Sequence, residues 1–591
     1  MNPPLCPTMK PMQNADISAM LDRIAELLEI KGEIRFKIQA YQKAARAVEN
    51  HEKPLADIHA EGGLKGLQEI PGIGEGIAKK IEEYIGWGRI KYYEELKAGL
   101  PRGVDELIQV PHLGPKTAIL LSSKLKIDGV ESLEKAIAAH RVAALPRMGE
   151  KTEEKLLKGI AIWREGQARI LLGEALPLAQ SVVERLGKLA VVSRIQFAGS
   201  LRRMKETVGD LDFLASPRKA SDTPAVMKAF MELDGVESVT EHGETKAQVR
   251  IHAGRRMVDA DLRVVAPESF GAALHYFTGS KTHNIHIREL GIKKGLKVNE
   301  YGIFRGKKSI GGAEEADVFK ALGLPFITPE LRENAGEIEA AQAGRLPALL
   351  EAKHIRGDLH THSNWSDGEG TIQEMAEAAR DLGYEYLGLC DHSQAVRIAN
   401  GLTPERLRSR NKAIDKLNAK YRGFRILKGA EVDIMKDGTL DFDDDLLAEL
   451  DVVVASVHSY FSLPEGEQTR RLVAAIGNHH VHIIGHPTGR MLAQREAYPV
   501  NMTEVIRASA GEGKALELNA QPWRLDLPDV FLRQAADAGV MVSIDSDSHD
   551  RSQLALVRHA GVGLARRGWL GPEKILNALS LPALLKKLAH K

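Results

Sequence analysis

The chain carries the stretch FAGSLRR at residues 197–203, followed closely by GDLD at residues 209–212. The apolar run around Asp210 and Asp212 predicts a β-strand, on which these two side chains point to the same face. Two carboxylates on one face can share a pair of divalent cations. Phosphoryl transfer uses such cations to activate the attacking hydroxyl and to neutralise developing charge. The stretch therefore predicts a metal-dependent nucleotide-transfer site on a sheet.

A third carboxylate follows in the stretch DADLR at residues 259–263. Asp261 can complete the metal cage from a neighbouring strand. Asp259 lies two residues earlier and could be mistaken for this ligand. We prefer Asp261 because Leu262 and Arg263 follow it directly.

The glycine-serine turn before the first two aspartates fits a triphosphate. Main-chain N–H groups near Gly199, the Ser200 hydroxyl and the Arg203 guanidinium all suit phosphate oxygens. The alternative is that the Asp-x-Asp pattern marks only a solvated strand edge. The glycine-serine turn directly upstream favours a catalytic site over a solvated strand edge.

A second cluster, YFTGS at residues 276–280, is followed by Asn284 and Arg288 one and two helical turns later. With the GS-x-RR pattern, the Asp-x-Asp pattern and the third aspartate, this order resembles family X DNA polymerases of the polymerase beta type. The resemblance implies a palm that binds Mg²⁺ or Mn²⁺ through Asp210, Asp212 and Asp261.

The resemblance also implies a set of nucleotide-binding residues. These are Gly199, Ser200, Arg203, Gly209, Tyr276, Phe277, Gly279, Asn284 and Arg288. In that scheme Arg288 probes the minor groove near the nascent base pair, and Glu300 supports the thumb. Lys281 stands where polymerase beta has an aspartate against the incoming base. We therefore expect nucleotide affinity and sugar discrimination to differ.

Three glycine turns interrupt the helical N-terminal part: IPGIG at 70–74, VPHLG at 110–114 and LPRMG at 145–149. The first two resemble helix-hairpin-helix motifs, in which exposed backbone N–H groups hold a DNA phosphate without reading sequence. The alternative is that each turn is only an ordinary connection between two helices. We expect the third turn to contribute to packing and not to contact DNA. The DNA contacts expected here are Gly72, Gly74, Lys80, Gly114 and Lys116, with Lys79 adding salt-dependent attraction.

Lys80 aligns with the lysine by which some family members form a Schiff base and remove a 5′-deoxyribose phosphate. Lys37 and Tyr41 resemble the neighbouring pocket. Such a lysine needs a depressed pKa, which a sequence does not report. The preferred interpretation is a plain phosphate-contacting or surface lysine, with lyase activity as the alternative.

Histidines and carboxylates recur after apolar strand patterns in the C-terminal part, beginning with His360 and His362 in DLHTHS. A parallel β/α barrel gathers such strand ends on one face, where active sites form. Imidazole mixed with carboxylate suits zinc, manganese or iron, and can generate a hydroxide that attacks a phosphoester.

The order of these residues resembles the PHP phosphoesterases. The resemblance implies a distorted barrel that holds up to three ions, Mn²⁺ and/or Zn²⁺. Because no expected ligand position is substituted, we predict that this centre is active. The ligands are His360, His362, Asp367, His392, Glu431, His458, His486, Asp547 and His549. We expect His479, His480, His482 and Asp545 to be surface or structural residues that do not bind metal. Arg490 is a candidate for binding substrate phosphate.

The fold class is therefore multidomain, α+β followed by α/β. The expected domains are helical DNA-binding at 1–95, a second helical domain at 96–168, palm at 169–266, thumb at 267–333, linker at 334–355 and a (β/α)7-type PHP barrel at 356–591. The barrel prediction rests on short strands that alternate with helical patterns. The linker, from Ile338 to His354, reads as a helix.

Composition fits a soluble globular protein: 591 residues, 43% hydrophobic, 27% charged and a net charge of +1. We find no apolar run long enough for a membrane span, so no membrane partner is expected. The two cysteines, Cys6 and Cys390, exclude a disulfide framework and suit a cytoplasmic protein. We expect a monomer.

The two resemblances together match bacterial family X polymerases with a PHP tail. They predict gap filling on gapped or nicked double-stranded DNA with dNTPs, plus a manganese-dependent 3′–5′ exonuclease, with abasic-site incision as an addition. Three alternatives stay open. The palm could add nucleotides to RNA, the barrel could hydrolyse a small ester such as histidinol phosphate, or the chain could be a non-enzymatic scaffold for DNA ends.

Overall fold

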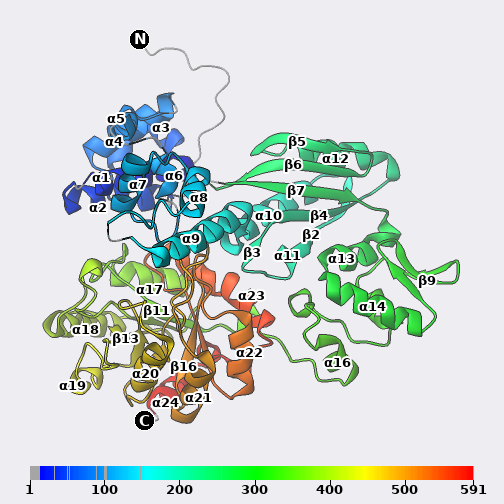
Figure 1. Cartoon of the computed structure of the whole chain (residues 1–591). Helices are drawn as coiled ribbons and strands as arrows, with labels where there is room; N and C mark the ends of the chain where they lie inside the picture. Colours follow the sequence, from blue (N-terminus) through cyan, green and yellow to red (C-terminus); the bar gives the residue numbers. More distant parts are fainter. Residues whose placement is uncertain are drawn as a thin grey trace. The chain divides into compact units, whose positions relative to one another are not determined.

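The structure is a computed structural model that describes residues 14–589 except residues 32, 50, 52, 88, 99–100, 102, 109, 147 and 255. Cys6 and Arg147, which enter the sequence argument above, lie outside the described residues. The chain forms two compact units (Figure 1). One comprises Met1–Ala168 with His252–Met257, and the other comprises Arg169–Ile251 with Val258–Lys591.

The first unit contains two helical bundles, each around its own apolar core. The helices of the first bundle are α1 (Asn14–Ile30), α2 (Arg35–Glu49), α3 (Leu55–Gln68), α4 (Glu75–Trp87) and α5 (Lys91–Ala98). Those of the second are α6 (Val104–Leu107), α7 (Pro115–Leu125), α8 (Val130–Ala138) and α9 (Glu150–Ala168). Buried aliphatic residues at helical spacing, such as Ile17, Leu21 and Ile24, explain why each helix turns one face inward.

The second unit begins with β1 (Ile170–Leu171), α10 (Leu172–Gly187) and a five-stranded sheet. The strand order is β2-β4-β7-β6-β5. Their bounds are β2 Val192–Phe197, β4 Asp210–Pro217, β5 Val236–His242, β6 Lys246–Ala253 and β7 Arg256–Val264. The sequence prediction of β2, β4, β6 and β7 is confirmed, whereas β5 was missed because most of its residues are exposed and polar.

Short elements surround this sheet and link it to the thumb region. They are α11 (Gly199–Arg202), β3 (Thr207–Val208), α12 (Thr223–Met231), α13 (Phe270–Thr278), α14 (Lys281–Lys293), β8 (Lys297–Asn299), β9 (Gly302–Arg305), β10 (Lys308–Gly311) and α15 (Ala316–Ala321). Strands β8, β9 and β10 form a small antiparallel sheet in the order β10-β9-β8.

The predicted linker helix from Ile338 to His354 is wrong in length. The structure has a short helix, α16 (Glu337–Gln342), and then an extended segment up to a 3-10 turn at Ala352–His354. Gly344 takes a φ of 64°, which ends the helix, and Pro347 disfavours a helical continuation.

The PHP region is a seven-stranded parallel sheet in sequential order, which confirms the predicted β/α alternation. The strands are β11 (Gly357–Thr361), β12 (Tyr386–Leu389), β13 (Arg425–Asp433), β14 (Val452–Ser456), β15 (Ile483–Ile484), β16 (Ala515–Asn519) and β17 (Val542–Asp545). A parallel bridge between Thr361 and Ser548 brings the first strand back to the last. The sheet is therefore a nearly closed barrel.

Helices connect and cover the barrel strands (Figure 1). They are α17 (Ile372–Asp381), α18 (Pro404–Asn418), α19 (Asp444–Leu447), α20 (Glu465–Ile476), α21 (Met502–Glu512), α22 (Asp529–Asp537), α23 (Ala560–Arg567) and α24 (Leu581–Ala589). Apolar strand residues fill the barrel interior, so the polar side chains that follow the strands collect at its carboxyl edge. Within residues 14–589, no described helix is both long and apolar enough to span a bilayer.

Candidate active sites

Three carboxylates meet at the edge of the five-stranded sheet. Strands β4 and β7 run parallel with Asp212 opposite Asp261, and ligand oxygens of these two and of Asp210 lie within 4.8 Å of one another. Asp259 is opposite Asp210 in the register, but its carboxylate lies 3.4 Å from Arg250 Nε. The structure thus places Asp261, and not Asp259, with the Asp-x-Asp pair.

These carboxylates repel one another. Burial, with the charges of Asp210 and Asp261, raises the pKa of Asp212 to about 7, against the opposing effect of Arg263 and Arg203. Burial is also the main cause of the raised pKa of Asp261. The Oδ1 atom of Asp261 is buried and has no hydrogen-bond partner among the described residues. Such a cluster fits divalent cations, which would balance the charge and fill the open ligand position.

Gly199 lets the glycine-serine turn approach this cluster. Its φ is 61°, and a Cβ atom there would lie 2.1 Å from Oδ2 of Asp212. The backbone N–H of Ala198 donates a 2.7 Å hydrogen bond to the carbonyl of Asp212. The turn and helix α11, which carries Ser200, therefore lie directly beside the carboxylates.

Arg203 joins this turn to the YFTGS stretch. Its Nη1 donates to the Thr278 carbonyl at 2.5 Å, and its Nε donates to Glu333 at 3.0 Å. The same oxygen of Glu333 accepts a 3.0 Å hydrogen bond from Arg567 of α23. The guanidinium expected to bind a triphosphate is therefore paired with Glu333, a residue that the sequence analysis did not single out.

Most of the other expected nucleotide-binding residues lie on α13, on α14 or between them, and Gly209 directly precedes β4. Asn284 Nδ2 donates to the Tyr276 carbonyl at 2.7 Å, and Arg288 Nε donates to the Asn284 carbonyl at 3.3 Å. The Phe277 ring lies 4.9 Å from the Arg263 guanidinium carbon. Gly279, with a φ of 71°, borders Arg203, and a Cβ at Gly209 would lie 3.4 Å from an Arg169 nitrogen.

The nine histidines and carboxylates of the barrel gather at its carboxyl edge. Eight of them form three overlapping groups, and within each group the ligand atoms lie within 4.8 Å of one another. The groups are His362, Asp367, His392 and His549; His360, His362 and Asp547; and His392, Glu431 and His458. His486 joins them because its Nε2 lies 3.0 Å from Glu431 Oε1. The structure brings together every barrel residue predicted as a ligand.

Two buried carboxylates behind the histidines were missed by the sequence analysis. Glu517 lies 2.6 Å from Nδ1 of His360 and accepts a 2.5 Å hydrogen bond from the His486 backbone N–H. Asp433 lies 3.1 Å from Nδ1 of His458. Glu517 lies in the middle of β16 and Asp433 at the end of β13, so an acidic residue in or at the end of an apolar strand was the available signal. Such partners fix ring orientation and ligand basicity.

The electrostatics of this cluster fit a multi-cation site. Burial opposes charge on His458 and His549, yet neighbouring carboxylates raise the pKa of each to about 9. Burial and the neighbouring histidines lower the pKa of His362 to about 4. The Nδ1 atoms of His362 and His486 are buried without a hydrogen-bond partner among the described residues. Imidazole nitrogens and carboxylate oxygens gathered in this way are a suitable donor set for zinc, manganese or iron.

The residues that were expected not to bind metal lie outside these three groups. His482 receives the Val453 N–H on Nδ1 and lies 3.2 Å from the Leu588 carbonyl through Nε2. The rings of His479 and His480 contact each other in a tilted arrangement, with 3.7 Å between centroids. Asp545 accepts the Leu359 N–H at 2.9 Å.

The guanidinium of Arg490, the candidate for substrate phosphate, is already bound by protein oxygens, which disfavours that role. Its guanidinium donates to Glu206, at 3.1 and 2.7 Å, and to the carbonyls of Arg524 and Leu525. All its nitrogen atoms are therefore engaged by protein oxygens.

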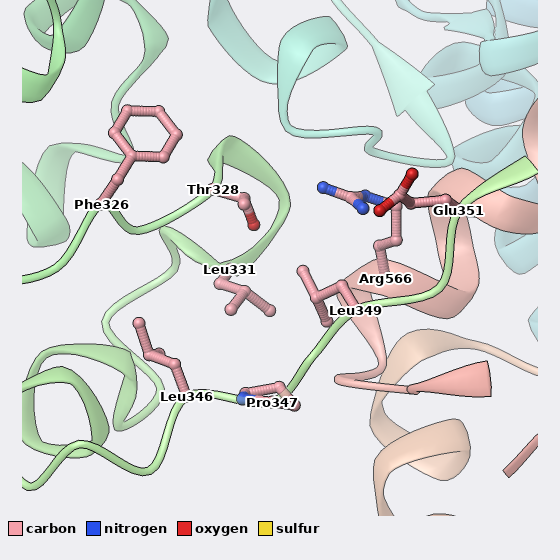
Figure 2. A pocket seen from close by; sticks show the side chains of 8 residues that line it. All are labelled: Phe326, Thr328, Leu331, Leu346, Pro347, Leu349, Glu351 and Arg566. Atoms are coloured by element: carbon pink, nitrogen blue, oxygen red, sulfur yellow. The ribbon is translucent and has the colours of Figure 1, made fainter. Parts of the chain in front are cut away.

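A separate hollow of about 380 Å³ lies near the linker and contains none of the expected ligands. Figure 2 shows its mainly apolar lining: Phe326, Thr328, Leu331, Leu346, Pro347, Leu349, Glu351 and Arg566. Arg566 is paired with Glu330 at 2.8 Å. Nothing in this hollow supplies the chemistry of the two clusters.

In the first unit, the two glycine turns each precede a helix. Gly72 takes a φ of 90° in a turn closed by the Ile73 N–H and the Ile70 carbonyl, and α4 follows. Gly114 is the N-cap of α7. Gly72, Gly74, Gly114 and Lys116 are exposed, whereas Lys79 is paired with Glu75 at 2.6 Å.

Lys80 lies in an aromatic corner. Its Nζ is 4.9 Å from the Tyr92 ring centroid and 5.9 Å from that of Tyr41, and Lys37 lies 5.5 Å from the Tyr92 ring. Burial, aided by the charge of Lys37, lowers the pKa of Lys80 against the opposing charge of Glu83. The structure thus brings Lys80, Lys37 and Tyr41 together and adds Tyr92.

Comparisons with protein families match four parts of the chain. Residues 12–90 match a helix-hairpin-helix domain, and residues 104–161 match a SAM-like helix-hairpin-helix tandem. Residues 273–333 match the DNA polymerase beta thumb, and residues 358–521 match the PHP domain.

Curated relatives extend these matches over the whole chain. The DNA polymerase/3′-5′ exonuclease PolX of Bacillus subtilis is 40% identical over 577 residues, which cover 96% of this chain and 98% of the relative. DNA polymerase lambda of Rattus norvegicus is 26% identical over 54% of this chain and 56% of its own length. A probable phosphatase of Syntrophotalea carbinolica is 31% identical over 37% of this chain and 90% of its own length. With both site geometries and a full-length relative in agreement, the chain belongs to the PolX family of DNA polymerase/3′–5′ exonucleases.

Proposed function

We propose that this enzyme fills short gaps in DNA with its palm site and trims 3′ ends with its PHP site. The observation that carries the proposal is that one chain holds two separate ligand sets. One is the carboxylate trio of the palm, and the other is the histidine-carboxylate cluster at the barrel edge. Each set matches a distinct phosphoryl chemistry.

In the palm, Asp210, Asp212 and Asp261 would hold Mg²⁺ or Mn²⁺. Bound cations of this kind lower the pKa of the attacking 3′ hydroxyl and neutralise charge on the phosphates. The glycine-serine turn and Arg203 would hold the triphosphate, which the position of the turn directly beside Asp212 supports. Tyr276 and Asn284, which line a small hollow, would contact the base and sugar of a dNTP.

In the barrel, the nine-residue set would hold up to three ions, Mn²⁺ and/or Zn²⁺. Such ions would supply a hydroxide near neutral pH for hydrolysis of the terminal phosphodiester. Glu517 and Asp433, which lie against Nδ1 of His360 and of His458, would orient these two histidine rings. Abasic-site incision requires the same chemistry at an internal phosphodiester.

The helix-hairpin-helix turns would hold gapped or nicked duplex DNA through its phosphates, with Lys116 adding electrostatic attraction. The proposal places the protein in the cytoplasm as a monomer. Cys390 is buried and unpaired, which suits a reducing compartment.

A 5′-labelled primer beside a one-nucleotide gap tests this proposal. With Mn²⁺ and dNTPs the primer grows by the templated nucleotide, without dNTPs it shortens, and a chelator stops both reactions. An RNA primer without template and histidinol phosphate test the two enzymatic alternatives. Faster turnover of either alternative substrate would contradict the proposal, and turnover that no chelator affects would contradict a metal-dependent enzyme.

A second candidate activity is removal of a 5′-deoxyribose phosphate by Lys80. The observation that favours it is the lowered pKa of Lys80 inside the corner formed by Tyr41 and Tyr92. A partly buried lysine with a lowered pKa presents more neutral amine for Schiff-base formation.

A further inference from the structure

The loop that follows β16 is fixed tightly to the metal-ligand edge of the barrel. The Asn519 N–H donates to the Asp526 carbonyl at 2.5 Å, and the Asp526 N–H donates back at 3.2 Å. Gln521 Nε2 donates to the carbonyls of Ser546 at 2.7 Å and of Asp547 at 3.0 Å. The loop therefore presents its tip, Arg524, at a fixed place beside Asp547.

Arg490 holds the same loop from its other side. Its Nε donates to the Arg524 carbonyl at 3.1 Å and its Nη2 to the Leu525 carbonyl. Its remaining bonds go to Glu206, in the segment between α11 and β3. Arg490 thus acts on the loop backbone and leaves the Arg524 side chain free to face the cluster.

The Arg524 guanidinium lies at the cluster without a hydrogen bond of its own among the described residues. Its Nε is 3.8 Å from Asp547 Oδ2, and 16% of its side chain is exposed. Asp547 does not need this arginine, because Asn519 Nδ2 donates to Oδ2 at 3.0 Å and His362 Nε2 lies 3.1 Å from Oδ1. The donors of Arg524 therefore remain available to a ligand.

We propose that Arg524 binds the non-bridging oxygens of the terminal phosphodiester at the DNA 3′ end, and of the nucleoside 5′-monophosphate that leaves. The Asp547 carboxylate balances this guanidinium only in part, because it is shared with Asn519, His362 and the cations that the cluster would hold, so a further anion is attracted to the site. Phosphate is the anion of this reaction, and the planar guanidinium fork matches its oxygens. This proposal rests on the proposed exonuclease function and assigns to Arg524 the role first expected of Arg490.

The test compares Arg524→Ala and Arg524→Lys with Arg408→Ala. Arg408 is a matched control because it lies in the same barrel, pairs with Glu449 at the surface, and loses the same charge. The measurements are kcat/KM for 3′ shortening of an oligonucleotide in Mn²⁺, the affinity for dTMP by calorimetry, and the Mn²⁺ concentration at half-maximal rate. Gap filling by the palm checks that each variant is folded.

Arg524→Ala should lower kcat/KM about 100-fold, as loss of one preorganised donor to developing negative charge does. It should also weaken dTMP binding about tenfold, as expected for a charged hydrogen bond. Arg524→Lys should fall between this variant and the wild type, because it keeps the charge but loses the fork. The Mn²⁺ requirement, gap filling and the Arg408→Ala variant should stay unchanged.

Unchanged shortening and dTMP affinity in Arg524→Ala would overturn the proposal. So would a higher Mn²⁺ requirement with unchanged dTMP affinity, since Arg524 would then only support Asp547. A wild-type protein that does not shorten DNA in Mn²⁺ would instead overturn the exonuclease function itself, and the role of Arg524 with it.

Discussion

The buried carboxylate of Glu517 lies 2.6 Å from Nδ1 of His360, on the side of the ring away from the metal-ligand cluster. This contact directs Nε2 of His360 toward His362, whose Nε2 is 3.3 Å away. The second oxygen of Glu517 accepts the His486 N–H. One carboxylate thus orients two of the expected ligands.

Glu517→Gln should weaken Mn²⁺ binding by about 10- to 100-fold, the usual effect of losing a carboxylate behind a ligating histidine. Metal titration of the purified protein measures this directly. Glu512→Gln is the control, because Glu512 ends helix α21 at an exposed position. Equal Mn²⁺ affinity in the Glu517 variant and the control would refute the orienting role.

Glu333 pairs with the arginine expected to bind the triphosphate. Glu333→Gln should lower the KM for dNTP about threefold or more, because a charged hydrogen bond to Arg203 no longer competes with the phosphates. Steady-state gap filling with varied dNTP measures the change. Glu330→Gln, which breaks the neighbouring ion pair with Arg566, should leave KM unchanged. A raised KM in Glu333→Gln would show that Glu333 positions Arg203 productively.

Strand ends were predictable from the sequence, and with them most of both ligand sets. Asp210 and Asp212 follow from alternation on a strand, and the barrel histidines follow apolar runs that became β11 to β17. The same signal was present for Glu517, but a single acidic residue in a strand does not reveal that a histidine lies behind it.

Pairs between distant segments could not be predicted. Glu333 is 130 residues from Arg203, and Arg490 is 284 residues from Glu206. Their meeting depends on how the palm, thumb and barrel pack, which leaves no periodicity in the sequence. The same packing explains why Arg490 was expected at the phosphate and Arg524 was not considered.

Lys80 should form a Schiff base with a 5′-deoxyribose phosphate that borohydride can trap. Since burial lowers its pKa below the ordinary value of 10.5, the trapped adduct should increase with pH through a midpoint below that value. Lys80→Ala should abolish the adduct, while Lys79→Ala, which only loses the Glu75 pair, should retain it. An adduct that persists in Lys80→Ala would place the lyase chemistry elsewhere or exclude it.

The buried pair of His283 and Glu337, 2.7 Å apart, should make the thumb region sensitive to acid. Burial lowers the pKa of His283, so the folded state resists its protonation and loses stability as pH falls below about 6.5. Burial opposes charge on Glu337, but the His283 hydrogen bond and backbone N–H groups lower its pKa. Its contribution is present above its unfolded pKa and is lost as pH falls further.

Thermal unfolding between pH 7 and pH 5 measures this effect. His283→Gln should show a shallower fall in Tm than the wild type over that range. His286→Gln, on the same helix but half-buried and bonded to Asn334, should follow the wild type more closely. Parallel Tm profiles for wild type and His283→Gln would contradict the assignment.

The central claim is that polymerisation and 3′ shortening occur at separate sites of one chain. A gapped, 5′-phosphorylated primer-template in Mn²⁺, with and without dNTPs, tests it in two double variants. Asp210→Ala/Asp212→Ala should lose extension and keep shortening, and His360→Ala/His362→Ala should do the reverse. If both variants lose shortening, or neither does, the division of labour is wrong and the barrel acts on another substrate.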